Sequence, residues 1–308
     1  MSFYSLSNAL TIGAILSLVA VGLYIAFRIV RFPDLSCDGS YAMGACVSAV
    51  IASYGLSPWI GIFASTLIGF IAGMVTGGMY TKLKFPPVVA GIITMTAAYS
   101  MNLLMMGLPN LAIKLNHSLF GNIEIWIREA GDGLVIYNGV YPIICLSGIG
   151  IIFILIWRFL ISEIGLCWRC VGIDSNLASS QGINVEISIP LALGLANSLI
   201  SLAGGLLAHY QRFADVNMGI GIIMVGLASV FIGQSFEVFF KKRHHYCKIG
   251  AQVFCVLIGS ILYRIIITMA YELGLPTSVF NLVTASLVFL ALLSPAMRKN
   301  WTTVFSRK

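Results

Sequence analysis

Long apolar runs, separated by short polar breaks, occupy almost the whole chain. A helix needs about 20 apolar residues to cross the hydrocarbon layer of a membrane, and the runs have this length. The pattern therefore predicts an all-α, polytopic integral membrane protein with about nine transmembrane helices in a single domain, residues 1–308. The second and seventh spans are short, as expected for helices that begin part-way into the bilayer. The predicted spans are residues 8–30, 39–54, 58–80, 86–106, 139–161, 189–210, 217–234, 249–271 and 279–296.

A short sequence element occurs once in each half of the chain. The first copy is Phe-Pro-Asp-Leu-Ser at residues 32–36, and the second is Phe-Ala-Asp-Val-Asn at residues 213–217. Each leads into an apolar stretch rich in glycine, which we expect to be helical. Residues 86–94 also align without a gap with residues 276–284. Because many membrane transporters consist of inverted repeats with interrupted helices, we predict two inverted halves, residues 32–106 and 213–296.

The composition and the charge distribution agree with a membrane protein. Hydrophobic residues make up 59% of the chain and charged residues only 9%, whereas soluble proteins contain about 25% charged residues. The net charge of +7 comes from Lys and Arg that cluster next to the predicted spans, where they meet anionic lipid head groups, so nucleic-acid binding is not indicated. Cytoplasmic loops of membrane proteins carry an excess of Lys and Arg. Most of the basic residues lie on the cytoplasmic side only if the N-terminus is outside and the C-terminus inside, so we predict that orientation.

The N-terminal segment and the cysteines add two expectations. Residues 1–10 contain no Lys or Arg, so they lack the positive region of a cleavable signal peptide, and residues 8–30 are expected to be a retained helix. The seven cysteines show no pairing pattern and are expected to be free thiols. Cys167 and Cys170 form an isolated Cys-x-x-Cys without a second ligand pair, which we interpret as coincidence rather than a metal site.

Three glycines recur every fourth residue on one predicted helix. Gly69, Gly73 and Gly77 would lie on one face and allow another helix backbone to approach closely. The predicted partner is either a helix of the same bundle or a second subunit of the same kind.

The longest cytoplasmic break, residues 162–188, carries charged residues among apolar ones. Glu163, Arg169 and Asp174 stand among apolar residues there. The alternative interpretation is an ordinary connector, but a connector would not require charged residues in such positions. Residues 174–176 form a polar turn before a short stretch that Asn or Ser could cap and Gly182 could end. We therefore predict a short helix across the cytoplasmic face.

Four stretches resemble the permease subunits of ATP-binding-cassette importers of the branched-chain amino acid class, especially a sub-group thought to handle aromatic or other amino acids. They are residues 32–40, 83–87, 163–185 and 213–221. The resemblance implies that residues 162–188 are a coupling element docked on a cytoplasmic ATPase, and that a separate binding protein delivers the solute. It also implies a dimer with itself or a similar permease, a location in the bacterial inner membrane, and ATP and Mg bound by the ATPase, with no cofactor in this chain.

The candidate functional residues fall into two sets. The proposed substrate path consists of polar groups at the two helix interruptions and within apolar spans: Asp34, Ser36, Asp38, Asn102, Asn197, Asp215, Asn217 and Arg264. Alternatively, Asp34 and Asp215 cap helix N-termini, which the helix dipole favours by about 0.3–1 kcal/mol, the two asparagines join neighbouring helices, and Arg264 extends to the outer surface. The proposed coupling residues are Glu163, Gly165, Arg169, Gly172, Asp174, Ala178 and Gly182.

These features predict a transport subunit rather than an enzyme. The chain has no phosphate-binding Gly-x-x-x-x-Gly-Lys-Ser/Thr loop, so a partner must hydrolyse the ATP that drives import of an amino acid or similar small polar solute. A secondary transporter driven by an ion gradient is the alternative, because such proteins also use inverted repeats and intramembrane carboxylates. A membrane-embedded enzyme would need clustered catalytic groups, and the 11 acidic residues are too dispersed.

Overall fold

The computed structural model describes residues 3–121, 124, 133–237, 245–274, 276, 279 and 282–289, and these are mostly helical. The long helices are α1 (Phe3–Leu23), which continues as a π-helical segment (Tyr24–Ile29), α3 (Pro58–Thr81), α4 (Pro87–Met106), α6 (Gly133–Ile161), α9 (Val185–Gln211) and α11 (His245–Glu272). The shorter helices are α2 (Cys37–Ser53), α7 (Glu163–Ile173), α8 (Ser175–Ser180), α10 (Ile222–Glu237) and the 3-10 turn Leu115–His117.

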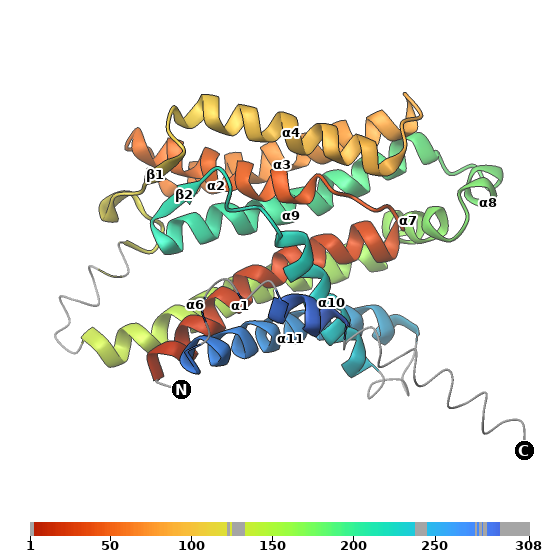
Figure 1. The fold of residues 1–308 in the computed structure, drawn as a ribbon. Helices are drawn as coiled ribbons and strands as arrows, with labels where there is room; N and C mark the ends of the chain where they lie inside the picture. The colour runs from red at the N-terminus through yellow and green to blue at the C-terminus, as the bar shows by residue number, and fades with distance from the viewer. Residues whose placement is uncertain are drawn as a thin grey trace, which may run out of the picture.

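The helices form two groups that lie side by side (Figure 1). One group contains α2, α3, α4 and α9, and the other contains α1, α6, α10 and α11, with α1 packed on α9 between them. Helices α1 and α9 are buried along most of their length. A helix that is apolar on all sides belongs in the centre of a bundle, which explains why these two helices join the groups.

Two short strands close the end of the bundle opposite α7 and α8 (Figure 1). Strand β1 (Asn110–Ala112) pairs antiparallel with β2 (Phe213–Asp215), with Leu111 opposite Ala214. The pairing links the segment after α4 to the segment after α9.

Six described helices are long and apolar enough to cross a membrane. They are Phe3–Ile29, Pro58–Thr81, Pro87–Met106, Tyr141–Ile161, Val185–Gln211 and Gly250–Glu272. Helix α2 has 17 residues, and the apolar part of α10, Ile222–Ser235, is also short, as predicted for the second and seventh spans. Of the predicted ninth span, residues 279–296, the described part includes a helical stretch at 282–289. The polytopic helical architecture is confirmed, and the number of about nine spans stays a prediction.

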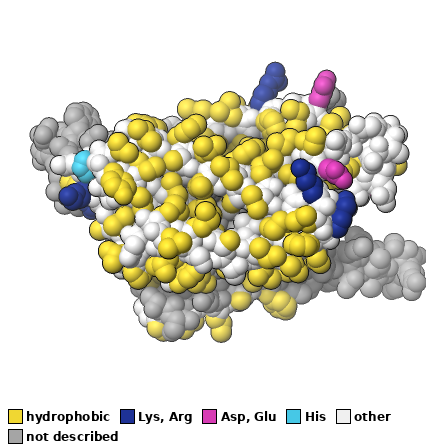
Figure 2. All heavy atoms as spheres, turned by 90° about the horizontal axis from the view of Figure 1, so that it is seen from above, with side chains coloured by type: hydrophobic (Ala, Val, Ile, Leu, Met, Phe, Trp, Pro, Cys, Tyr) yellow, Lys and Arg dark blue, Asp and Glu magenta, His cyan; other side chains and the backbone are white. Residues whose placement is uncertain are grey.

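The surface over α3 and α4 carries a broad apolar belt. Figure 2 shows hydrophobic side chains across the middle of this face and charged side chains only near its two ends. Phe63 of α3 is 71% exposed and Leu104 of α4 is 83% exposed. An exposed apolar area of this extent is unusual on a soluble monomer and is consistent with a chain that spans a membrane.

The predicted close helix contact is confirmed, and its partner is α9 of the same chain. A Cβ atom added at Gly69 would meet Ser201, one at Gly73 would meet the backbone of Leu193, and one at Gly77 would lie 2.5 Å from the Cα atom of Pro190. The three glycines therefore bring the α3 and α9 backbones together. None of six cysteines for which the structure describes the side chain forms a disulfide, as predicted; they are Cys37, Cys46, Cys145, Cys167, Cys170 and Cys255.

Replacing Gly73 with alanine should destabilise the α3–α9 contact by about 1–3 kcal/mol, because the added methyl group meets backbone atoms that have little room to move. Gly78→Ala on the same helix is the matched control, since nothing lies within 4 Å of its added Cβ atom. The thermal unfolding midpoint of the purified protein should fall for Gly73→Ala and stay the same or rise for Gly78→Ala. Equal midpoints for the two variants would contradict the proposed packing.

Candidate functional site

The two copies of the repeated element begin with the same backbone turn. Arg31 follows the π-helical end of α1 with φ 56°, and Arg212 ends α9 with φ 61°. Residues other than glycine rarely adopt this left-handed conformation, and among the described residues only Lys84 shares it. In each copy the turn is followed by Phe-x-Asp. The Arg31 turn lies beside α7 and the Arg212 turn beside β2, at opposite ends of the bundle (Figure 1).

The aspartate of each copy makes the same local hydrogen bond. Asp34 Oδ1 accepts from the backbone N–H of Ser36 at 2.8 Å, and Asp215 Oδ1 accepts from the backbone N–H of Asn217 at 2.6 Å. These are Asx turns, in which the side chain stabilises a bend two residues further on. Neither aspartate caps a helix, because α2 begins at Cys37 and α10 begins at Ile222 rather than near residue 217. The predicted capping role is therefore wrong for both residues.

Asp34 also connects the first interruption to the middle of α9. Its Oδ1 accepts a second hydrogen bond from Ser36 Oγ at 2.6 Å, and its Oδ2 accepts one from Asn197 Nδ2 at 2.7 Å. Asn197 Nδ2 also donates to the carbonyl of Leu193 at 3.1 Å. Asp34, Ser36 and Asn197 are each fully buried. Three predicted path residues thus form one buried cluster, and for Asn197 the predicted alternative of joining neighbouring elements is what the structure shows.

Asp38 of α2 caps a helix, but the helix is α10 from the other half of the chain. Its Oδ2 accepts from the N–H of Gly221 at 3.1 Å, and its Oδ1 accepts from the N–H of Ile223 at 3.0 Å. The first N–H groups of a helix have no partner within the helix, and a carboxylate there also interacts favourably with the helix dipole. A Cβ atom at Gly219 would overlap the Asp38 backbone carbonyl, so only glycine allows this close approach. The starts of the two short helices therefore meet at Asp38.

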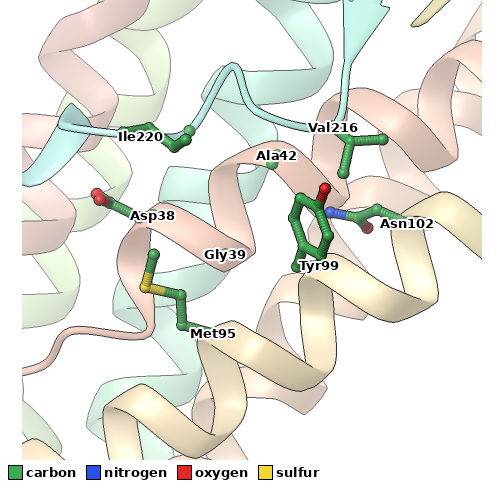
Figure 3. Close-up of a pocket in the computed structure, with 9 residues that line it drawn as sticks. Asp38, Gly39, Ala42, Met95, Tyr99, Asn102, Val216 and Ile220 are labelled. Carbon is green, nitrogen blue, oxygen red and sulfur yellow. The ribbon is translucent and has the colours of Figure 1, made fainter. Parts of the chain in front are cut away.

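A pocket lies where α2, α4 and the turns before α10 come together (Figure 3). Its empty volume is about 260 Å³, open solvent included, and it opens to the surface beside Tyr99, which is 48% exposed. Of the predicted path residues, Asp38 and Asn102 line it. Tyr99 was not predicted, although it stands one helical turn before Asn102. The lining residues are Asp38, Gly39, Ala42, Met95, Tyr99, Asn102, Val216, Gly219 and Ile220.

The remaining predicted path residues lie elsewhere. Asp215 is the last residue of β2 and Asn217 is exposed just after it. Arg264 is on α11 and lies beside α1: a Cβ atom added at Gly13 of α1 would be 3.3 Å from the Cβ atom of Arg264. It is partly buried and has no ion-pair partner in the described part of the chain. The structure does not bring these three residues to the pocket.

The predicted coupling segment folds as two helices, α7 and α8. Three of its predicted residues face the bundle: Gly165 packs on Leu160, Ala178 is buried, and Gly172 lies so close to Ile29 that a Cβ atom there would overlap the Ile29 carbonyl. Helix α7 therefore rests on the π-helical end of α1. This contact is two residues before Arg31, where the first interruption begins.

The outer face of α7 and α8 combines polar and apolar groups. Asp174 Oδ1 accepts from the N–H groups of Asn176 and Leu177, so Asp174, rather than the predicted Asn or Ser, caps α8. Gly182 follows the helix with φ 84°, as predicted for a helix end. Ile173 is 70% exposed and Leu177 is 57% exposed on either side of the capping aspartate. Sequence reasoning missed both, although apolar residues that flank a polar turn in a predicted cytoplasmic break are a usable signal.

The other two predicted coupling residues have local roles. Glu163 is exposed in the first turn of α7, and Arg169 Nε donates to the carbonyl of Gly165 at 3.2 Å, within the same helix. We call Ile173, Asp174, Leu177 and Gly182 the α7–α8 surface.

Comparison with known proteins adds an independent line of argument. The sequence pattern of the family described as "Branched-chain amino acid transport system / permease component" matches residues 5–293. A tyrosine transport system permease protein of Clostridioides difficile is 34% identical over 283 residues, which cover 91% of this chain and 88% of that protein. A probable branched-chain amino acid transport permease protein of Methanocaldococcus jannaschii is 25% identical, covering 74% of this chain and 73% of its own length. No solved structure was found to match the chain.

Proposed function

Because the chain belongs to the family of branched-chain amino acid transport system permease components, it is a permease subunit of an ATP-binding-cassette importer, and we propose that it carries an aromatic amino acid into the cell. The tyrosine transport permease of C. difficile, the relative with 34% identity, supports this solute class. The proposed location is the bacterial inner membrane, with the N-terminus outside, the C-terminus inside and α7–α8 in the cytoplasm. The positions of the basic residues support this orientation.

The observation that carries the proposal is the contact between α7 and the end of α1. Gly172 rests against the Ile29 carbonyl, directly before the interruption that contains Asp34 and leads into α2. A push on α7 is therefore transmitted to the start of α2, and through Asp38 to the start of α10. This gives a partner ATPase, which would bind and hydrolyse ATP with Mg, a mechanical route to the centre of the membrane domain.

The α7–α8 surface is the proposed docking site for that ATPase. Ile173 and Leu177 are apolar and exposed on an element that is expected to lie outside the membrane, and Asp174 adds a hydrogen-bonding group between them. Exposed apolar residues rimmed by polar groups are typical of protein–protein contacts.

The repeated Arg-Phe-x-Asp turns support two inverted halves, residues 32–106 and 213–296. The two turns share a left-handed arginine and an Asx turn, and they occur at opposite ends of the bundle. Two short helices that begin near each other inside the membrane domain are the feature that inverted-repeat transporters use to form a central path.

The pocket beside Tyr99 suggests that a second permease subunit completes the path. The pocket is open on one side, so this chain alone does not enclose a small molecule there. Helix α4 exposes Thr96 and Ser100 next to this opening, although lipid contact favours apolar groups. A second copy, or a similar permease, would cover this face, and a separate binding protein would deliver the solute at the end that carries β1 and β2.

Replacing Asp174 with alanine and Gly182 with valine together should uncouple ATP hydrolysis from uptake. The first change removes the cap of α8, worth about 1 kcal/mol, and the second strains a residue with φ 84°. Uptake of radiolabelled L-tyrosine by the assembled complex should fall by about tenfold or more while its ATPase activity persists and the chain still inserts. Ser180→Ala is the control, because the Ser180 hydroxyl pairs only within α8. Unchanged uptake in the double variant would refute the assignment of α7–α8 as the coupling element.

A further inference from the structure

Asn102 of α4 is a buried amide without a partner. The residue is fully buried, and neither its Oδ1 nor its Nδ2 forms a hydrogen bond within the part of the chain that the structure describes. A buried amide that lacks both hydrogen bonds is costly, and native proteins rarely keep one without a reason. The amide is therefore free to form hydrogen bonds with a water molecule or with a polar group of a solute that enters the adjoining pocket.

The side chain of Asn102 lies in the wall of the pocket, next to Tyr99. Figure 3 shows the amide directed towards the ring of Tyr99, which stands one turn earlier on α4. Tyr99 is half-exposed at the mouth of the pocket, and none of the described residues forms a hydrogen bond with its hydroxyl group. A movement of the ring would therefore break no hydrogen bond among the described residues, and it would uncover the amide.

The chemistry of the pocket selects a neutral group. Asp38 is the charged residue in its lining, and each of its carboxylate oxygens already accepts one hydrogen bond, from the N–H group of Gly221 or of Ile223. Figure 3 also shows the carboxylate directed away from Tyr99. The rest of the lining is apolar apart from Tyr99 and Asn102. The pocket therefore offers the NH2 group of Asn102 as a donor and its amide oxygen as an acceptor, within apolar surroundings.

We propose that Asn102 is a solute-binding residue that receives a neutral hydroxyl group, such as the phenol of a tyrosine side chain, as the solute passes through the membrane domain. The hydroxyl donates to Oδ1 and accepts from Nδ2, and Tyr99 covers the amide when the pocket is empty. The inference rests on the proposed function in one respect: it takes this pocket to be part of the path along which the solute crosses the membrane domain.

Protection of a cysteine at position 95 tests the proposal without an ATPase. Met95 lines the pocket, so the rate at which a maleimide labels a Met95→Cys variant in lipid nanodiscs reports whether a solute occupies the pocket. Labelling of the chain without this change is subtracted, because the other cysteines also react. L-Tyrosine should slow labelling about threefold or more compared with L-phenylalanine at equal concentration, and addition of Asn102→Leu should remove the difference. Equal effects of the two amino acids, or a preference that survives Asn102→Leu, would overturn the proposal.

Uptake by the complete importer provides the second measurement. Asn102→Leu should lower the maximal rate of L-tyrosine uptake by about three- to tenfold and leave that of L-phenylalanine unchanged. Ser147→Ala on α6, whose hydroxyl pairs within its own helix, should change neither rate. Because Leu removes an unpaired amide, the unfolding midpoint should not fall; a lower midpoint with both rates reduced would assign Asn102 a structural role and overturn the proposal. If ATP-driven uptake is absent altogether, the proposed function fails, whereas the labelling result still decides the role of Asn102.

Discussion

Replacement of Asn197 with alanine is expected to abolish transport and to destabilise the protein. The change removes the hydrogen bond from Nδ2 to Asp34 Oδ2 and leaves a fully buried carboxyl oxygen without this donor. Hydrogen bonds to charged groups contribute about 1.5–3 kcal/mol, and a buried group that loses its partner also keeps its desolvation cost. The interruption between α1 and α2 would lose its connection to α9, so both the unfolding midpoint and the rate of uptake should fall.

Ser198→Ala is the matched control for this prediction. Ser198 is the next residue on α9, and its hydroxyl donates to Leu195 within the same helix. Its removal should change the unfolding midpoint and the uptake rate little. If Asn197→Ala behaves like Ser198→Ala in both measurements, the Asp34 cluster does not hold the interruption in place.

Replacement of Asp38 with alanine is expected to have a comparably large effect by separating the starts of α2 and α10. The N–H groups of Gly221 and Ile223 would lose their acceptor. The two N–H groups are part-buried, so each costs up to about 1–3 kcal/mol when unpaired, and the favourable interaction of the carboxylate with the α10 dipole is lost as well. Uptake should stop, because a movement of α2 would no longer be passed to α10.

Asp38→Asn separates the two contributions. Asparagine keeps one oxygen acceptor of nearly the same shape and lacks the charge, so it should retain part of the uptake and of the stability. Uptake rates and unfolding midpoints should therefore rank the wild type first, Asp38→Asn second and Asp38→Ala last. An Asp38→Ala protein that transports at the rate of the wild type would exclude Asp38 as the link between the two short helices.

The positions of the long helices could be predicted from the sequence, because apolar runs of membrane-spanning length are expected to be helical. The start of α10 was predicted too early, since the apolar glycine-rich stretch reads as helix. Gly221 has φ 83°, and residues 216–221 form a series of turns, so the helix begins only at Ile222. The repeated Phe-x-Asp element correctly marked both interruptions, because an aspartate followed by a small polar residue favours an Asx turn.

The functional contacts could be predicted only in part. The polar residues near the interruptions could be identified because they stand in apolar surroundings, but the sequence did not indicate which groups they would form hydrogen bonds with. Asp38 bonds to N–H groups that are more than 180 residues away in the sequence, and Asn197 is 163 residues from Asp34. No local pattern encodes such pairs. Tyr99 was missed because an aromatic residue on a membrane helix is ordinary until the unpaired Asn102 is found beside it.

The most direct test of the account is uptake of radiolabelled L-tyrosine when ATP and the ion gradients are removed separately. Cells or vesicles that contain the chain with its ATPase and binding protein are depleted of ATP while the ion gradients are maintained, and in a parallel sample the gradients are collapsed while ATP is maintained. A permease driven through α7 and the end of α1 should stop in the first sample and continue in the second. Uptake that continues without ATP and stops when the gradients collapse would contradict the account and identify a secondary transporter.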